Sequence, residues 1–174
     1  MKTALFSVIS LVLYSSCLFA GVQEQIQYIR DIYAWTNEEI EKEELYKTVV
    51  DVNTEGLSYP AVGTYHPLLT FYFGFSEENP YPDNLRKAIL IVDRAAYHEY
   101  SEFLYDGYGN LIFVYMTGRP VEPEMRFYYY QGELIKIVED SSDYYSFNFE
   151  QIDHSNSVQN QGEELIGTFL RLFY

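Results

Sequence analysis

Glu124, Arg126, Tyr128 and Tyr130 are the residues whose types and spacing most strongly suggest a binding site. Side chains alternate between the two faces of an extended strand, so residues two apart project to the same side. On that side a guanidinium could pair with a ligand carboxylate, and tyrosine rings could stack on a sugar or pack against a peptide. The row therefore predicts a polar and aromatic binding strip. In the alternative, Arg126 pairs with an acid of a neighbouring strand and the tyrosines only cover the sheet.

Metal and cofactor chemistry finds little support in the sequence. His66, His98 and His154 lie in three separate segments, and none belongs to a spacing such as HExxH or HxH that places two ligands on one face. The chain also lacks a phosphate-binding loop and a dinucleotide fingerprint. We therefore expect no metal ion and no cofactor.

No motif marks a catalytic centre. A serine nucleophile needs a base within hydrogen-bond reach and a third group that orients the base, and Gly-x-Ser-x-Gly is absent. Carboxylate pairs for glycoside hydrolysis, such as Glu99 with Glu102 or Glu122 with Glu124, are expected by chance among 26 acids. The sequence therefore designates no catalytic residue.

The predicted strip belongs to an antiparallel sheet. Residues 103–115 and 127–138 each contain an aromatic run, a glycine-bearing turn, a Leu-Ile pair and further β-branched or aromatic residues, which is the pattern of a β-hairpin. Leu85, Leu111 and Leu134 hold the same place in the pattern at spacings of 26 and 23 residues. These spacings predict a degenerate repeat of three hairpins, whose first copy lacks the glycine.

The register of the last hairpin depends on its turn. If Gly132 and Glu133 form a two-residue loop, Phe127 lies opposite Val138. A turn that begins one residue earlier would flip one strand relative to its partner. Under either register both faces carry apolar residues, so we expect each face to be at least partly covered.

Two helices are predicted to flank the sheet. Apolar residues recur at steps of four and three from residue 22 to about residue 47, and again over residues 163–174, where Ser157 or Asn160 could form the cap. Residues 144–149 could add an edge strand. The predicted fold is α+β, an antiparallel meander of about 5–7 strands with an N-terminal and a C-terminal helix packed on one face.

The first 20 residues resemble an export signal. Lys2 precedes an 11-residue apolar run, which suits a signal peptide and is too short to span a bilayer. Cleavage after Ala20 would leave Gly21 first, and residues 22–174 are predicted to form a single domain. In the alternative, Leu13-Tyr-Ser-Ser-Cys17 resembles a bacterial lipobox, and lipidated Cys17 would be the only membrane attachment. Either route predicts export to the periplasm, the cell envelope or the exterior.

Composition restricts the class of partner. The chain has 26 acidic and 11 basic residues, a formal net charge of −15, and 19 tyrosines. The electrostatic field of such a negative net charge repels polyanions, so we expect no nucleic-acid partner. The charge suits either solubility outside the cell or a cationic partner.

Several motifs resemble a family of uncharacterised exported bacterial proteins, many of them lipoproteins. The similarity covers much of residues 22–138 and rests on an opening helix, an acid-x-Arg-x-Tyr-Tyr pattern and a glycine turn that ends in Leu-Ile. The matching stretches are residues 29–37, Glu124-Met-Arg126-Phe-Tyr128-Tyr129, Gly132-Glu-Leu-Ile135, Tyr105 and Leu111-Ile-Phe-Val114. The resemblance implies export and an α+β fold, and it implies no activity.

The sequence thus predicts an exported, non-catalytic domain that binds a protein, peptide or glycan at the cell envelope. Two alternatives stay open: a small secreted hydrolase whose site is assembled only in the fold, and an inhibitor that blocks another protein's active site with its sheet. A buried cleft that holds His98 or His154 beside two acids would favour the hydrolase. A broad exposed tyrosine face would favour binding.

Overall fold

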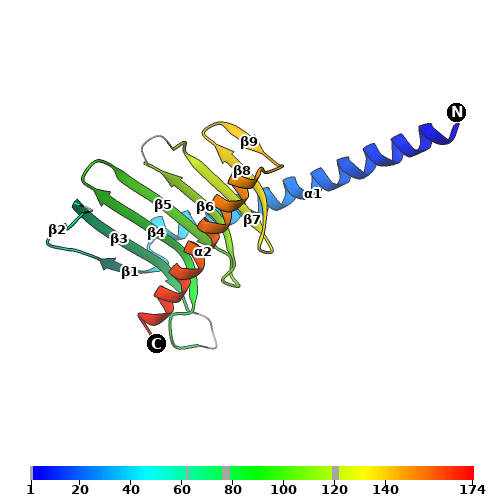
Figure 1. Ribbon diagram of the computed structural model, residues 1–174. Coiled ribbons are helices and arrows are strands. Elements are labelled where there is room, and N and C mark those ends of the chain that lie inside the picture. Colours follow the sequence, from blue (N-terminus) through cyan, green and yellow to red (C-terminus); the bar gives the residue numbers. More distant parts are fainter. Residues whose placement is uncertain (1, 62, 76–78, 119–121) are drawn as a thin grey trace.

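The computed structural model describes residues 2–61, 63–75, 79–118 and 122–174 of the 174-residue chain, with side chains from residue 21 onward within these ranges (Figure 1). The elements in chain order are α1 (Lys2–Glu41), β1 (Tyr46–Asp51), β2 (Ser58–Tyr59), β3 (Gly63–Gly74), β4 (Asn84–Arg94), β5 (His98–Tyr105), β6 (Leu111–Thr117), β7 (Met125–Tyr130), β8 (Glu133–Glu139), β9 (Ser142–Tyr144) and α2 (Phe149–Arg171). No helix in the described ranges combines the length and the apolar character that crossing a bilayer requires.

The strands form one antiparallel sheet in the order β1-β3-β4-β5-β6-β7-β8-β9, and the short β2 pairs with the start of β3. Neighbours from β3 onward are consecutive in the chain, as a meander requires. This architecture confirms the predicted α+β class. The described residues form nine strands, whereas the sequence pattern predicted about 5–7.

The three-hairpin repeat is present in the backbone geometry. Each of the hairpins β3–β4, β5–β6 and β7–β8 has a register shift directly after its repeat leucine, so the next residue bulges out of the ladder. The aligned pairs are Phe73–Leu85, Tyr105–Leu111 and Tyr129–Leu134, and the bulged residues are Arg86, Ile112 and Ile135. The repeat therefore conserves a bulge as well as a turn, and the first copy keeps the bulge without a glycine.

The last hairpin turns one residue earlier than Gly132-Glu133. Gln131 and Gly132 form the two-residue loop with φ of 52° and 80°, as a type I′ turn requires. With the bulge at Ile135, Phe127 lies opposite Ile137 and not opposite Val138. Of the two turns that the sequence left open, the structure has the earlier one. The bulge at Ile135 shifts the pairing by one further residue, and a bulge cannot be recognised from alternation alone.

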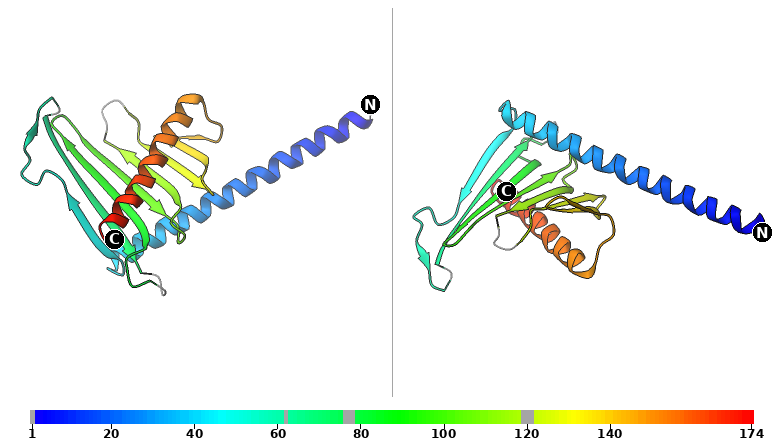
Figure 2. Two further views of the ribbon diagram at one scale, coloured as in Figure 1. Left: turned by 60° about the horizontal axis from the view of Figure 1, so that its bottom comes forward. Right: turned by 90° about the horizontal axis from the view of Figure 1, so that it is seen from above.

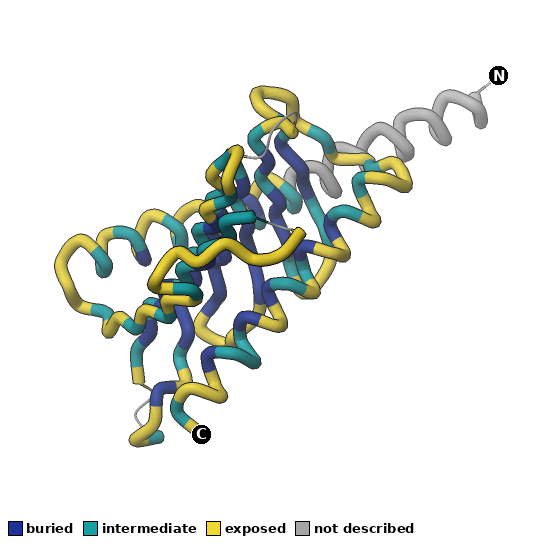
Figure 3. The backbone as a smooth tube through the Cα atoms, turned by 60° about the vertical axis from the view of Figure 1, so that its left-hand side comes forward, coloured by how far each residue is buried: buried dark blue, intermediate teal, exposed yellow. Residues whose placement is uncertain are grey.

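The two helices lie on opposite faces of the sheet, which corrects the prediction that both pack on one face (Figure 2). In β5, Phe103 and Tyr105 join the core beneath α2, whereas Leu104 between them joins the core beneath α1. All three are fully buried. Because both faces of the central strands are apolar, one layer of helices could not have covered them. Buried positions accordingly follow the central strands (Figure 3).

Helix α2 makes one equivalent contact with each hairpin, at helix positions seven residues apart. The contacts are Tyr129 OH to Ser155 O at 3.1 Å, Tyr105 OH to Gly162 O at 2.9 Å, and the rings of Phe73 and Phe169 with centroids 5.2 Å apart. Seven helical residues rise about 10.5 Å, close to the roughly 9.6 Å that separates alternate strands. The helix therefore crosses the sheet in step with the repeat.

The same contacts explain why the length of α2 was underestimated. Ser155 and Gly162 are small because the sheet approaches closely there: a Cβ on Gly162 would lie 2.7 Å from Leu111 Cδ2. The buried stripe of α2 is therefore not apolar throughout, and residues 153–161 looked polar in the sequence. The helix begins at Phe149 with a capping box formed by Asn148 and Gln151, so Ser157 and Asn160 lie inside the helix and are not caps.

Helix α1 is shorter at its C-terminal end than predicted. It ends at Glu41, Glu43 adopts a positive φ of 57°, and the chain enters β1 at Tyr46. At the other edge of the sheet, β9 ends at Tyr144, so residues 145–149 are not a strand.

Candidate functional site

The four residues of the predicted strip lie on the face of the sheet that α1 covers in part. Tyr128 is only 6% exposed and belongs to the core beneath α1. Its ring meets Phe113 edge-on with centroids 5.0 Å apart, and Lys136 Nζ lies 5.7 Å from its centroid. Tyr128 is therefore part of the packing under the helix and not of an open tyrosine surface.

Arg126 is held in place by its neighbours on β6 and β7. Its guanidinium forms an ion pair with Glu124 and stacks 5.3 Å from the centroid of the Tyr115 ring. The Tyr115 hydroxyl donates to Glu124 Oε2 at 3.1 Å. Burial and this bond raise the pKa of Tyr115, so the phenol stays a neutral donor. The partner of Arg126 is thus an acid two residues away, and not one on a neighbouring strand.

Arg126 and Tyr128 line a cavity of about 350 Å³ between α1 and strands β6 and β7. Its walls combine two guanidinium groups, three phenol rings and two apolar side chains: Arg30, Arg126, Tyr33, Tyr115, Tyr128, Ile29 and Phe113. Arg30 is exposed on α1, whereas Ile29 beside it is fully buried. A hollow of this size, mostly apolar with a few placed polar groups, is typical of a ligand site.

A buried polar network adjoins the cavity through Tyr33. Glu102 is 8% exposed and accepts hydrogen bonds from the hydroxyls of Tyr33 at 3.0 Å and Tyr100 at 2.5 Å. Lys87, which is 3% exposed, lies with Nζ 2.5 Å from Glu102 and also donates to Asn37 Oδ1 at 2.9 Å. Burial and then the charge of Glu102 raise the pKa of Tyr33. The network fixes α1 on the sheet and holds Tyr33 in position.

The strip is not continuous, because Tyr130 lies apart from Arg126 and Tyr128. It lines a different hollow of about 560 Å³, beside residues 21–28 of α1 and the turns after β5 and β7. Glu124 lines neither hollow, and its oxygens are engaged by Arg126 and Tyr115. The structure therefore places two of the four predicted residues in one cavity, with Glu124 paired to one of them.

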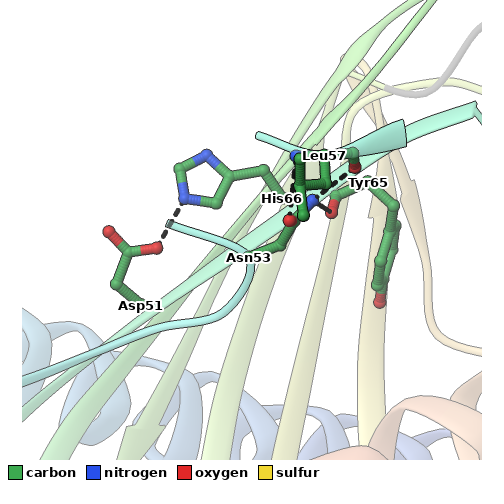
Figure 4. Close-up of polar contacts among 5 residues, drawn as sticks. All are labelled: Asp51, Asn53, Leu57, Tyr65 and His66. Atoms are coloured by element: carbon green, nitrogen blue, oxygen red, sulfur yellow. Dashed lines mark hydrogen bonds and ion pairs between the residues drawn. The ribbon is translucent and has the colours of Figure 1, made fainter. Parts of the chain in front are cut away.

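Two of the histidines form pairs with aspartates at the end of the sheet where β1 and β4 end and β3 and β5 begin. His66 Nε2 lies 2.6 Å from Asp51 Oδ1, beside the turn that the Asn53 side chain fixes through Leu57 and Tyr65 (Figure 4). His98 pairs with Asp93 in the same way on β4 and β5. The described residues contain no group of three or more His, Cys, Asp or Glu that could hold a metal ion.

His154 lies on α2 in a groove of about 760 Å³ whose lining includes Glu122, Glu139 and Glu150. Several of the groove's lining side chains are exposed, so it is open and not a buried cleft. His154 and Ser101 also share a small adjoining hollow, yet no hydrogen bond joins them among the described residues. The ring of His154 instead meets Phe127 edge-on, with centroids 5.2 Å apart.

Comparisons with protein-family models, with curated proteins and with solved structures find no match to this chain. The resemblance to exported bacterial proteins, and the export that it implies, stay predictions.

The sequence missed the contribution of α1 to the cavity. Ile29 and Tyr33 were assigned to the apolar stripe of the first helix, and Arg30 was not singled out. Arg30 directly follows Ile29 of the apolar stripe, so when Ile29 is buried Arg30 lies at the boundary of the covered face. That position could have indicated from the sequence that Arg30 borders the sheet. Cys17 lies in the part of α1 whose side chains fall outside the described ones.

Proposed function

We propose that this protein is an exported, non-catalytic binding domain that takes a carboxylate-bearing peptide or glycan in the cavity beneath α1. The observation that carries the proposal is the convergence of Arg30 and Arg126 with three tyrosines on one hollow. The chain has 26 acidic and only 11 basic residues, so two guanidinium groups on one hollow are of opposite sign to the net charge of the chain.

The chemistry of the walls suits such a ligand. A guanidinium recognises a carboxylate in two-point geometry, and tyrosine rings present an apolar face to a sugar or peptide with a hydroxyl at the edge. Arg126 is already oriented by Glu124 and Tyr115, so little side-chain freedom would be lost on binding. Arg30, which is exposed, would close on the ligand from the helix side. Attachment through Cys17 belongs to the same proposal and would keep the domain at the envelope.

Calorimetric titration of the full chain tests the proposal. The probes are a short glycan that carries a single uronic acid, the methyl ester of that glycan, a short peptide with a free C-terminal carboxylate and the same peptide with an amide. We expect only a carboxylate probe to bind, and the pair that binds identifies glycan or peptide. Arg30→Gln combined with Arg126→Gln should weaken binding about tenfold or more, because a charge-assisted hydrogen bond contributes about 1.5–3 kcal/mol.

The matched control is Arg171→Gln, which removes an exposed arginine from the last turn of α2, away from the cavity. This control should bind like the unaltered protein. Equal binding by the double variant, or equal binding of acid and neutral probes, would refute the proposal. Tyr128 should be changed only to Phe, because its ring is core and Tyr128→Ala would test folding.

A further inference from the structure

A second concave site lies on the opposite face, where α2 begins. The groove of about 760 Å³ runs between the first turns of α2 and strands β7 to β9. It is twice the size of the cavity beneath α1 and falls within the roughly 300–1,000 Å³ of small-ligand sites. The strip at Arg126 contributes nothing to it, so the two sites can be altered separately.

The floor of the groove is apolar. Met125 is buried, and Tyr144 and Phe147 are partly buried against the core beneath α2. Phe149, between the lining residues Asn148 and Glu150, is 82% exposed, and Ile152 one turn further is 44% exposed. Large apolar side chains left exposed beside a concave apolar floor are typical of a docking surface.

The walls of the groove are acidic. Glu122, Glu139 and Glu150 line it, and none of its described lining residues is Lys or Arg. Glu139 Oε1 accepts from Gln151 Nε2 at 2.9 Å, which holds this carboxylate at the groove wall. The start of α2 offers no competing anion site, because Asn148 and Gln151 satisfy each other's backbone amides. Local charge and the net charge of −15 therefore favour the same sign of ligand.

We infer that this groove docks a peptide segment of a partner protein in which a lysine or arginine stands next to a large apolar residue. The apolar side chain would rest on Met125 and Phe147, and the cationic group would meet Glu139 and Glu150. Charge complementarity selects this occupant: an acidic segment would be repelled from both walls. The inference goes beyond the proposed function, since it concerns a different face and the opposite sign of ligand.

Fluorescence anisotropy with the full chain tests this inference. The probe is a fluorescein-labelled, amidated hexapeptide of alternating Arg and Leu, and the comparison probes alternate Gln with Leu or Arg with Gly. We expect the Arg-Leu peptide to bind at low ionic strength, the Arg-Gly peptide to bind at least about tenfold more weakly and the uncharged Gln-Leu peptide not to bind. If the Arg-Gly and Arg-Leu peptides bound with equal affinity, the apolar floor would not contribute to recognition and the inference would be overturned.

The decisive comparison is between two double variants that each remove two negative charges, one pair in the groove and the other outside it. Glu139→Gln with Glu150→Gln should weaken binding about tenfold or more, whereas Glu163→Gln with Glu164→Gln, further along α2, should change it about twofold at most. An equal effect of both pairs would show attraction by net charge alone and overturn the inference. Phe149→Ala, an exposed change that leaves the core intact, should weaken the Arg-Leu peptide and spare the Arg-Gly peptide.

Discussion

The two faces of the sheet are built from the same strands and by different means. The face under α2 is apolar: 16 buried hydrophobic residues form one cluster there, against seven in the cluster beneath α1. The polar groups that the α2 face does bury include the hydroxyls of Tyr105 and Tyr129, and both donate to backbone carbonyls of α2. That face repeats an equivalent contact with α2 at each hairpin, and its groove lies where α2 begins.

The face under α1 carries ionised groups instead. Lys87, Glu102, Arg86 and Lys136 are all at least 90% buried there, from three different strands. Within the described structure, Arg86 Nε and Glu39 Oε2 are buried without a hydrogen-bond partner, and the two side chains meet as an ion pair with Arg86 Nη2 3.4 Å from Glu39 Oε2. Burying ion pairs is seldom better for stability than burying apolar residues of the same volume.

This contrast separates scaffold from site. On the α2 face apolar side chains pack together, whereas the α1 face buries charged side chains. Departures of this second kind from ordinary core packing concentrate at functional sites. The cavity with Arg30 and Arg126 lies on the polar face. We therefore regard α2 and the hairpin repeat as the scaffold, and α1 with the polar network as the part that shapes the proposed cavity.

The largest expected effect comes from truncating a central ring on each face. Phe127 is fully buried beneath α2, and Phe127→Ala should lower the free energy of unfolding by about 3–5 kcal/mol. Phe113 is 6% exposed and forms a wall of the cavity beneath α1. Phe113→Ala should cost clearly less, because a ring beside an existing hollow makes fewer contacts. Urea denaturation measures both, and equal losses would break the distinction between the faces.

The sequence predicted the repeated scaffold better than the site. The leucine spacing located three hairpins, since turns, β-branched residues and aromatic runs are local signals. Sequence inspection overlooked that Phe71, Phe103 and Phe127, all fully buried, occupy one repeat position, two residues before the aligned aromatic. It failed at the bulges and at Ser155 and Gly162, because these depend on how closely another element approaches.

The cavity could be predicted only in part, for a different reason. Residues two apart on β7 do share a face, as the strand pattern required. Which helix covers that face is a non-local choice, and α1 took it while α2 took the other. The helix buried Tyr128, added Arg30 and Tyr33, and separated Tyr130 from the rest. Alternation along a strand predicts which residues share a face of the sheet. Whether those residues are exposed depends on which helix packs over that face.

A second prediction concerns the ion pair at the centre of the α1 face. Lys87→Met should destabilise the protein by about 3 kcal/mol at neutral pH, because it leaves Glu102 buried without its cation. Adding Glu102→Gln should recover most of that loss, since Gln removes the charge, accepts from one of the Tyr33 and Tyr100 hydroxyls and can donate its amide N–H to the other. Chemical denaturation of the two variants measures the difference. A double variant no more stable than Lys87→Met would show that the pair itself is needed.

The smallest expected effect belongs to the hydroxyls that join the α2 face to its helix. Tyr129→Phe should cost about 1 kcal/mol at neutral pH, because the carbonyl of Ser155 loses a donor. Burial raises the pKa of Tyr129 and Tyr105 in the folded state. Their contribution is therefore complete below the ordinary tyrosine pKa near 10 and is lost as the pH rises above it.

Stability measured from pH 8 to pH 11 should consequently fall at the alkaline end, and less steeply in Tyr129→Phe, because one fewer phenol is then held protonated by the fold. Tyr108→Phe is the matched control, since Tyr108 is 92% exposed in the turn after β5 and should change neither the stability nor the slope. If both variants kept the same alkaline slope as the unaltered protein, the buried phenols would not tie α2 to the repeat. The helix would then be held by its apolar side chains alone, as Phe169 already is at Phe73.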